Sequence, residues 1–169
     1  MQSVIPLWKE LEYFKEYQAK LRSFLGAAKA NEILGEALYV MSLGTNDFLE
    51  NYYTMPDRRS HFTIEEYQNF LIGISEHFIT NLYDLGARKL DLTGIPPMGC
   101  LPLERATNFR SVGSCNEEYN KVARDFNRKL QELADKLNRT LPGMRIAYCN
   151  AYDVVLQVVE KPSAYGKLD

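Results

Sequence analysis

The segment Gly44-Thr45-Asn46-Asp47 combines residue types that can take part in catalysis, and it directly follows a short apolar run, residues 37–43. Such a run is typical of a strand buried on both faces. A side-chain amide that leaves the end of a buried strand, here that of Asn46, can donate hydrogen bonds to a developing oxyanion. The same residue types also form turns and helix caps, so these four residues alone leave both interpretations open.

A nucleophile and a base are harder to find. His61 follows Asp57 by four positions, one too many for an Asp-x-x-His pattern, and the segment around it predicts a surface loop. His77 lies beside the apolar stripe of a predicted helix, where we expect a partly buried, hydrogen-bonded histidine. No serine stands in a Gly-x-Ser-x-Gly elbow. The residues therefore predict no complete catalytic triad.

Three cysteines are present, Cys100, Cys115 and Cys149, and no two form a Cys-x-x-Cys pair. Zinc ribbons and thioredoxin-like redox chemistry are therefore not predicted, and we expect neither a metal nor a cofactor. One disulfide with one odd thiol is compatible with this count. Cys149 lies in an apolar strand pattern and is expected to be an inert core residue. Asn138-Arg139-Thr140 is a candidate glycosylation sequon.

Composition narrows the class of protein. The chain of 169 residues, 46% of them hydrophobic, is long enough for one domain with its own core. A net charge of −2 offers no basic excess for a phosphate backbone, so a nucleic-acid partner is not expected. No run approaches the roughly 20 apolar residues of a membrane span, and charges are spread through the first thirty residues. We expect no transmembrane segment and no signal peptide.

The predicted elements alternate between helix and strand. Apolar spacing predicts a helix over residues 4–28, and residues 37–43 and 89–95 read as strands. Between these strands, Thr63 and Glu66 form a capping box that begins a long helix. Gly86 suits the end of that helix.

The second half continues the pattern. Asn116 suits the N-cap of a helix that ends near Arg139, and a strand over residues 145–149 precedes a helix over 151–160. This order predicts an α/β fold with a parallel sheet and helices on both faces. Chemistry then gathers at the carboxyl ends of the strands, on the segments 44–53, 94–103 and around Asn150.

Three segments of the chain resemble the plant GDSL esterase/lipase family, a branch of the SGNH hydrolases. The segment over residues 39–48 resembles the family's Gly-x-Asn-Asp block, and residues 85–102 resemble its strand and Pro-rich loop. Cys115-Asn116 with Phe126-Asn127 and Leu130 is similar to the helix that follows. The resemblance covers nearly the whole chain, which we interpret as a single partial domain over residues 1–169.

The resemblance implies an incomplete three-layer α/β/α flavodoxin-like fold and hydrolysis of small-molecule or lipid carboxylic esters by a Ser-His-Asp triad. In the family the third-block asparagine donates to the oxyanion hole, a role that falls on Asn46. Gly44, Thr45 and Phe48 then become candidate substrate-binding residues and Asp47 a structural one. The aromatic residues Phe48, Tyr52 and Tyr53 either line an acyl pocket or pack in the core.

The family pattern also implies a Cys100–Cys115 disulfide if the protein is secreted, as family members generally are. Two family blocks have no counterpart in the sequence, the Gly-Asp-Ser-Leu block of the nucleophile and the Asp-x-x-His block. We therefore expect a truncated hydrolase that is inactive alone. The alternatives are a non-catalytic interaction module and a product whose full reading frame holds both blocks. Without the nucleophile strand, an apolar sheet edge is expected to be exposed and to favour self-association.

Overall fold

The computed structural model describes residues 4–108 and 113–166. Within these ranges, three parallel strands form one sheet in the order β1-β2-β3. The strands are β1 (Leu38–Ser42), β2 (Lys89–Thr93) and β3 (Arg145–Cys149). The helices are α1 (Leu7–Leu25), α2 (Ala27–Glu36), η1 (Asp47–Thr54), α3 (Pro56–His61), α4 (Ile64–Asp84), η2 (Met98–Cys100), α5 (Pro102–Ala106), α6 (Glu117–Thr140), α7 (Ala151–Glu160) and η3 (Pro162–Ala164).

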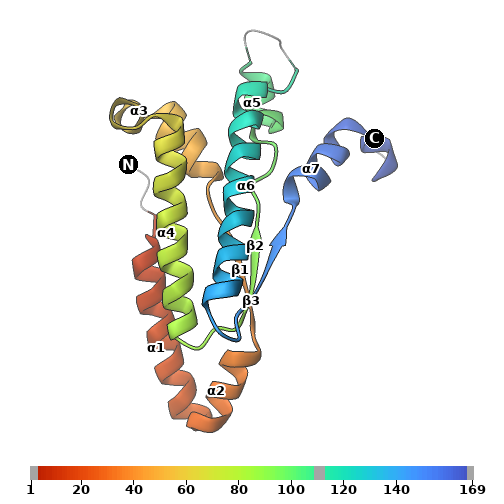
Figure 1. Cartoon of the computed structure of the whole chain (residues 1–169). Helices are drawn as coiled ribbons and strands as arrows, with labels where there is room; N and C mark the ends of the chain where they lie inside the picture. The colour runs from red at the N-terminus through yellow and green to blue at the C-terminus, as the bar shows by residue number, and fades with distance from the viewer. Residues whose placement is uncertain (1–3, 109–112, 167–169) are drawn as a thin grey trace.

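The two long helices begin where the sequence predicts. Thr63 and Glu66 form the capping box of α4, and the side chain of Asn116 accepts from the backbone N–H groups of Glu118 and Tyr119 at the start of α6. Both helices lie side by side over the sheet, with α1 against α4 (Figure 1). Their buried apolar faces, together with alternate residues of the strands, form the main core.

The prediction of one helix over residues 4–28 is wrong. The chain turns sharply at Gly26, whose φ of +79° is accessible to glycine at low cost, and α2 leaves in a new direction (Figure 1). The apolar pattern of the first helix runs on past this residue, so periodicity alone did not reveal the break. The short helix α2 then leads directly into β1.

Helices cover only one face of the sheet among the described residues. Met41, Leu90, Leu92 and Ile146 point into the core, whereas Leu38 is 63% exposed and Val40 68% exposed. Within the described residues, the expectations of helices on both faces and of a first strand buried on both faces are therefore wrong. The architecture is an incomplete α/β sandwich in which β1 has a neighbouring strand on one side only within the described residues.

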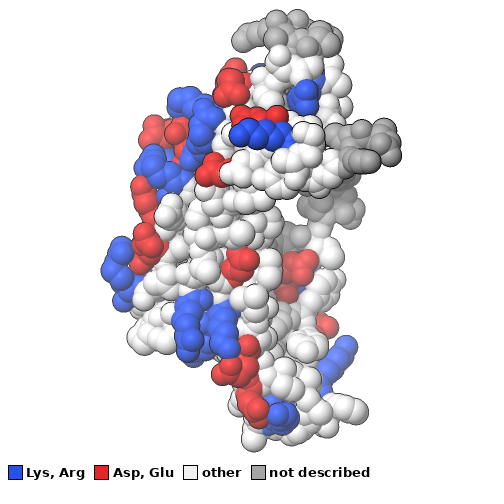
Figure 2. Space-filling view, turned by 90° about the vertical axis from the view of Figure 1, so that its right-hand side faces the viewer, with Lys and Arg blue, Asp and Glu red and all other residues white. Residues whose placement is uncertain are grey.

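The helix α6 is strongly amphipathic: it buries an apolar face and turns a charged face outward. Figure 2 shows Lys and Arg side chains interspersed with Asp and Glu side chains over the face seen there, with no large area of one sign. Among the described residues, no helix is both long and apolar enough to cross a membrane.

Candidate functional site

The carboxyl ends of the three strands lie at one edge of the sheet. Ser42, Thr93 and Cys149 are paired in register, and the backbone N–H of Gly94 donates to the carbonyl of Cys149 at 2.9 Å. The segments that begin with Gly44, Gly94 and Asn150 therefore leave the sheet side by side. This is the edge at which open parallel sheets bind their substrates.

Asn46 lies at this edge with its side chain exposed. It is the N-cap residue of η1, yet its amide caps nothing and makes no hydrogen bond to another described residue. The segment η1 is a π-helix, a rare form that recurs at functional sites. The amide of Asn46 is therefore held on ordered backbone with both of its N–H groups free to donate.

Gly44 fixes the backbone before Asn46. Its φ is +119°, and a Cβ atom at this position would lie 3.0 Å from the ring of Phe126 and 3.2 Å from Ile95. The Gly44 carbonyl accepts from the N–H of Phe48 at 3.0 Å. Any larger residue would displace the chain from α6, so the glycine sets the position of Asn46.

Asp47 is half-buried beside Asn46. Burial raises the pKa of its carboxyl, while a 3.5 Å hydrogen bond from Asn51 and the charge of Arg58 act in the opposite direction. The neighbouring Thr45 is also half-buried. The carboxyl of Asp47 therefore loses its proton less readily than that of a free aspartate, because burial disfavours the charged form.

The aromatic residues after Asn46 pack mainly in the core. Phe48 has no exposed surface, and its ring centre lies 5.1 Å from that of Phe126 and 5.9 Å from that of Tyr67. Tyr52 is also buried, whereas Tyr53 is half-buried against Tyr119, with 4.2 Å between the ring centres. Of the two alternatives drawn from the sequence, core packing describes Phe48.

Tyr52 and Tyr53 also line a pocket of about 540 Å³ between α4 and α6. Charged side chains from both helices surround it, and the buried Gln68 donates there to the carbonyl of Val122 at 3.2 Å. Phe48 is not among its lining residues. Asn46, the candidate oxyanion donor, does not line it either, so we do not assign this pocket to the site at the carboxyl edge of the sheet.

Two buried asparagines of α6 hold the loop that follows β2. Asn127 accepts from the N–H of Ile95 at 2.8 Å and donates to its carbonyl at 2.9 Å. Two turns earlier on the same face of α6, Asn120 accepts from the N–H of Gly99 at 2.9 Å and donates to Glu117 at 2.9 Å. We did not predict these contacts. The available signal was two asparagines seven positions apart on an otherwise apolar helix face.

Gly99 shows how closely this loop approaches α6. A Cβ atom there would overlap the carbonyl of Asn116, the N-cap residue. Nearby, Cys100 and Cys115 are joined by a disulfide, which connects the loop to the segment just before α6. The loop after β2 is thus fixed to α6 by side-chain hydrogen bonds, a close backbone contact and a covalent bond.

Cys149 is exposed, so the expectation of a core cysteine is wrong. Its side chain belongs to the face of β3 that no described helix covers, together with those of Arg145 and Ala147. The strand pattern was read correctly, but burial of the cysteine depends on which elements cover this face of the sheet. The thiol is open to solvent on the described surface.

The histidines do not form a catalytic pair with Asn46. His61 is exposed in α3, and its Nδ1 lies 2.8 Å from the Asp57 carbonyl, 3.1 Å from Ser60 Oγ and 3.8 Å from the Asp57 carboxylate. A triad needs the carboxylate and the serine on opposite ring nitrogens, so this local cluster is not one. His77 is exposed rather than partly buried, and its Nε2 lies 3.2 Å from Asn81 Nδ2.

Asn138, the sequon residue, makes two hydrogen bonds to one strand residue. Its Oδ1 accepts from the N–H of Ile146 at 2.8 Å, and its Nδ2 donates to the Ile146 carbonyl at 2.9 Å. The amide therefore occupies a position that a further strand would take beside β3. Among the described residues, no group of three or more His, Cys, Asp and Glu side chains is placed to hold a metal ion.

Comparison with known proteins matches residues 9–166 to the family model GDSL-like Lipase/Acylhydrolase. The chain is 57% identical over 163 residues to GDSL esterase/lipase At2g42990 of Arabidopsis thaliana and 55% identical over 164 residues to GDSL esterase/lipase At4g26790 of the same plant. These alignments cover 96% and 97% of the chain but 47% of each relative. The chain thus spans about half the length of the curated relatives it matches.

Proposed function

Because this chain belongs to the GDSL-like lipase/acylhydrolase family, we propose that it forms the part of a carboxylic ester hydrolase that supplies Asn46 to the oxyanion hole. The observation that carries the proposal is the free amide of Asn46, exposed at the carboxyl edge of the sheet and held by Gly44. An amide already bonded within the protein would have to break that bond before binding an oxyanion. The amide of Asn46 has no such cost.

In this mechanism a serine attacks the carbonyl carbon of a small-molecule or lipid ester. The carbonyl oxygen then gains negative charge, and Asn46 Nδ2 donates a hydrogen bond to it. A histidine, oriented by an aspartate, takes the serine proton and returns it to the leaving alcohol. The 169 residues contain no Gly-Asp-Ser and no Asp-x-x-His sequence, so we propose that this chain does not turn over esters alone.

The first test uses the purified chain with short-chain p-nitrophenyl esters and a phosphonate probe followed by intact mass. We expect neither turnover nor an adduct. A stoichiometric adduct together with turnover that Asn46→Ala abolishes would show that a serine within these residues completes the site. That result would overturn the proposed incompleteness and support the role of Asn46.

The second test uses a chimera in which this chain replaces the segment of At2g42990 that it matches, and the rest of the protein comes from that relative. In an active chimera, Asn46→Ala is expected to lower kcat about 100- to 1000-fold. Asn46→Asp keeps the size but removes the donor and should behave alike. Asn69→Ala, an exposed change on α4, is the matched control. An unchanged kcat in both Asn46 variants would refute the oxyanion role.

A second candidate function is an interaction module that pairs through β1. Leu38 and Val40 are exposed on the strand that has a neighbour on one side only within the described residues. Free strand edges with apolar side chains pair with other strands. We propose self-association at micromolar concentration, measured by sedimentation, which Val40→Lys weakens. A monomer at all concentrations would exclude this candidate.

We also propose that the protein works in an oxidising compartment outside the cytosol. The Cys100–Cys115 disulfide supports this proposal, because such bonds persist mainly in secreted proteins. Intact mass of the protein from its native source, after alkylation without reductant, should show two cysteines protected. Three alkylated cysteines would contradict it.

A further inference from the structure

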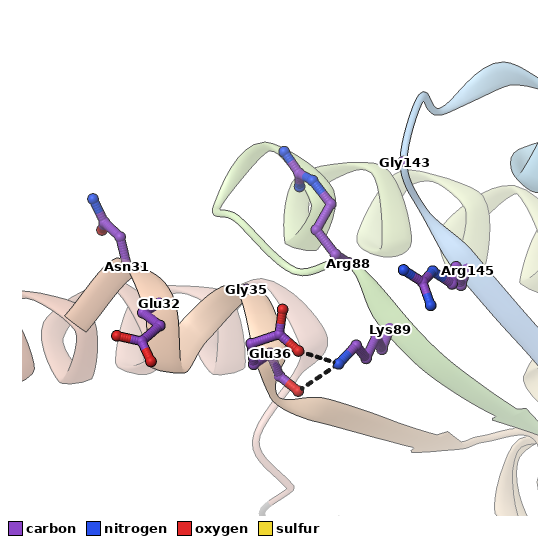
Figure 3. A pocket seen from close by; sticks show the side chains of 8 residues that line it. All are labelled: Asn31, Glu32, Gly35, Glu36, Arg88, Lys89, Gly143 and Arg145. Carbon is purple, nitrogen blue, oxygen red and sulfur yellow. Dashed lines mark hydrogen bonds and ion pairs between the residues drawn. The ribbon is translucent and has the colours of Figure 1, made fainter. Parts of the chain in front are cut away.

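A second pocket lies at the opposite edge of the sheet from Asn46. Lys89 and Arg145 are register partners at the amino ends of β2 and β3, and the Arg145 N–H donates to the carbonyl of Arg88 at 2.8 Å. These three residues form one wall of a cavity of about 320 Å³. Residues of α2, among them Glu32 and Glu36, form the facing wall (Figure 3). We call this cavity the amino-edge pocket.

The basic wall is ordered, and two of its charges are not neutralised. Arg88 donates through Nη1 to the carbonyls of Tyr83 at 2.8 Å and Ala87 at 2.7 Å, and its guanidinium stacks 4.1 Å from the ring centre of Tyr83. These contacts fix its orientation and leave its positive charge without a carboxylate. Arg145 likewise takes part in none of the ion pairs found among the described residues, and its side chain is exposed toward the cavity (Figure 3). Planar guanidinium groups suit phosphate oxygens.

The acidic wall carries the opposite charge. Glu36 pairs with Lys89 at 2.5 Å, and Lys89 lowers the pKa of the Glu36 carboxyl, with a smaller effect from Arg145. Glu32 points along the same helix face and pairs with Lys29 outside the pocket at 3.0 Å. The Lys89–Glu36 pair joins the two walls and lies between Glu32 and Arg145 in the view of Figure 3. The acidic side of the pocket thus holds two carboxylates that are each paired, Glu36 with Lys89 and Glu32 with the exposed Lys29, whereas the basic side holds two guanidinium groups without a carboxylate partner.

We propose that the amino-edge pocket binds a zwitterionic phosphodiester, with its phosphate against Arg88 and Arg145 and its ammonium group against Glu32. An anion alone would face the glutamates, and a cation alone would face the arginines. A ligand that carries both charges a few bonds apart satisfies both walls. Glycerophosphoethanolamine and the head group of an ethanolamine lipid share this chemistry. The proposal does not depend on the catalytic role of Asn46.

Binding of glycerophosphoethanolamine to the full chain tests the proposal by calorimetry. We expect it to bind about tenfold or more tightly than glycerol phosphate or ethanolamine, because each of these satisfies one wall. Arg145→Gln and Glu32→Gln should each reduce the affinity about tenfold, whereas Arg139→Gln and Glu160→Gln, exposed changes elsewhere, should not. Equal binding of glycerol phosphate, or no binding by any of the three, would overturn the proposal.

Vesicles distinguish the two sources of such a ligand. If the pocket takes a membrane lipid, the chain should sediment with ethanolamine-lipid vesicles, and soluble glycerophosphoethanolamine should compete. If it takes a free zwitterion, only the soluble compound should bind, and Arg145→Gln should lower its affinity about tenfold as above. Vesicle binding that Arg145→Gln and Glu32→Gln leave unchanged would place the contact elsewhere and refute the site. Melting curves of each variant show that the fold is retained.

Discussion

Asn127 and Ile95 exchange two hydrogen bonds across the junction of α6 and the loop after β2. The Asn127 amide accepts from the Ile95 N–H at 2.8 Å and donates to its carbonyl at 2.9 Å. Ile95 is fully buried and Asn127 is 6% exposed, so water cannot replace either bond. The Asn127 side chain thus pairs the backbone N–H and carbonyl of Ile95, as a neighbouring strand would in a sheet.

Asn127→Leu tests this relationship. Leucine has the branched shape of asparagine but is larger and cannot form hydrogen bonds, so it leaves the buried N–H and carbonyl of Ile95 without partners. We expect the free energy of unfolding to fall by about 2–6 kcal/mol, since each unsatisfied buried group costs about 1–3 kcal/mol. Urea denaturation measures the change. The exposed variant Gln131→Leu, at a side chain that makes no hydrogen bond to another described residue, should stay within about 0.5 kcal/mol of the parent. A similarly small loss for Asn127→Leu would mean that the loop re-pairs elsewhere.

The sequon residue Asn138 offers a second test. Asn138→Ala should destabilise the chain by about 1–3 kcal/mol, because two hydrogen bonds to Ile146 are lost at a partly exposed site. Thr140→Ala removes the sequon but keeps the amide. If a glycan matters for stability, Thr140→Ala should match Asn138→Ala in protein made by glycosylating cells. If the hydrogen bonds matter, only Asn138→Ala should lower the melting temperature.

The disulfide predicts a third outcome. Cys100→Ser with Cys115→Ser opens a loop of 15 residues, which costs about 3 kcal/mol in the chain-entropy model. Loss of the contact from Asn120 Nδ2 to Cys100 Sγ adds to this effect. Cys149→Ser should be nearly neutral, because that thiol is exposed. Equal stability of the double variant and the parent under non-reducing conditions would contradict the pairing.

The raised pKa of Asp47 predicts how stability depends on pH. The folded chain holds this proton more tightly than the unfolded chain, whose Asp titrates near about 3.9. Stability should therefore fall as pH rises from that value through the folded pKa, and the full penalty persists above it. Asp47→Asn removes the penalty, so it should raise the melting temperature at pH 7 and have little effect at pH 3. A destabilising effect at pH 7 would show that the carboxylate is held by contacts stronger than its desolvation.

The sequence by itself determined the elements whose signals are local. The capping box of Thr63 and Glu66, the cap at Asn116 and the strand over residues 145–149 lie where the chain predicts them. Each depends on residues within one or two turns, and the apolar stripe of α6 reinforces the pattern. The segment around Asn46 that resembles the family likewise stands in contiguous sequence, so the sequence alone indicates the candidate oxyanion donor.

The tertiary structure decided what depends on residues distant in sequence. The exposure of Val40 and Cys149 follows from which layers cover the sheet, and no strand pattern reports that. The roles of Asn127 and Asn120 follow from the approach of the β2 loop to α6, across 32 and 21 positions. The amino-edge pocket exists because α2 turns at Gly26 and faces two strand ends. Hydrogen bonding and charge act through space, so only the fold brings these groups together.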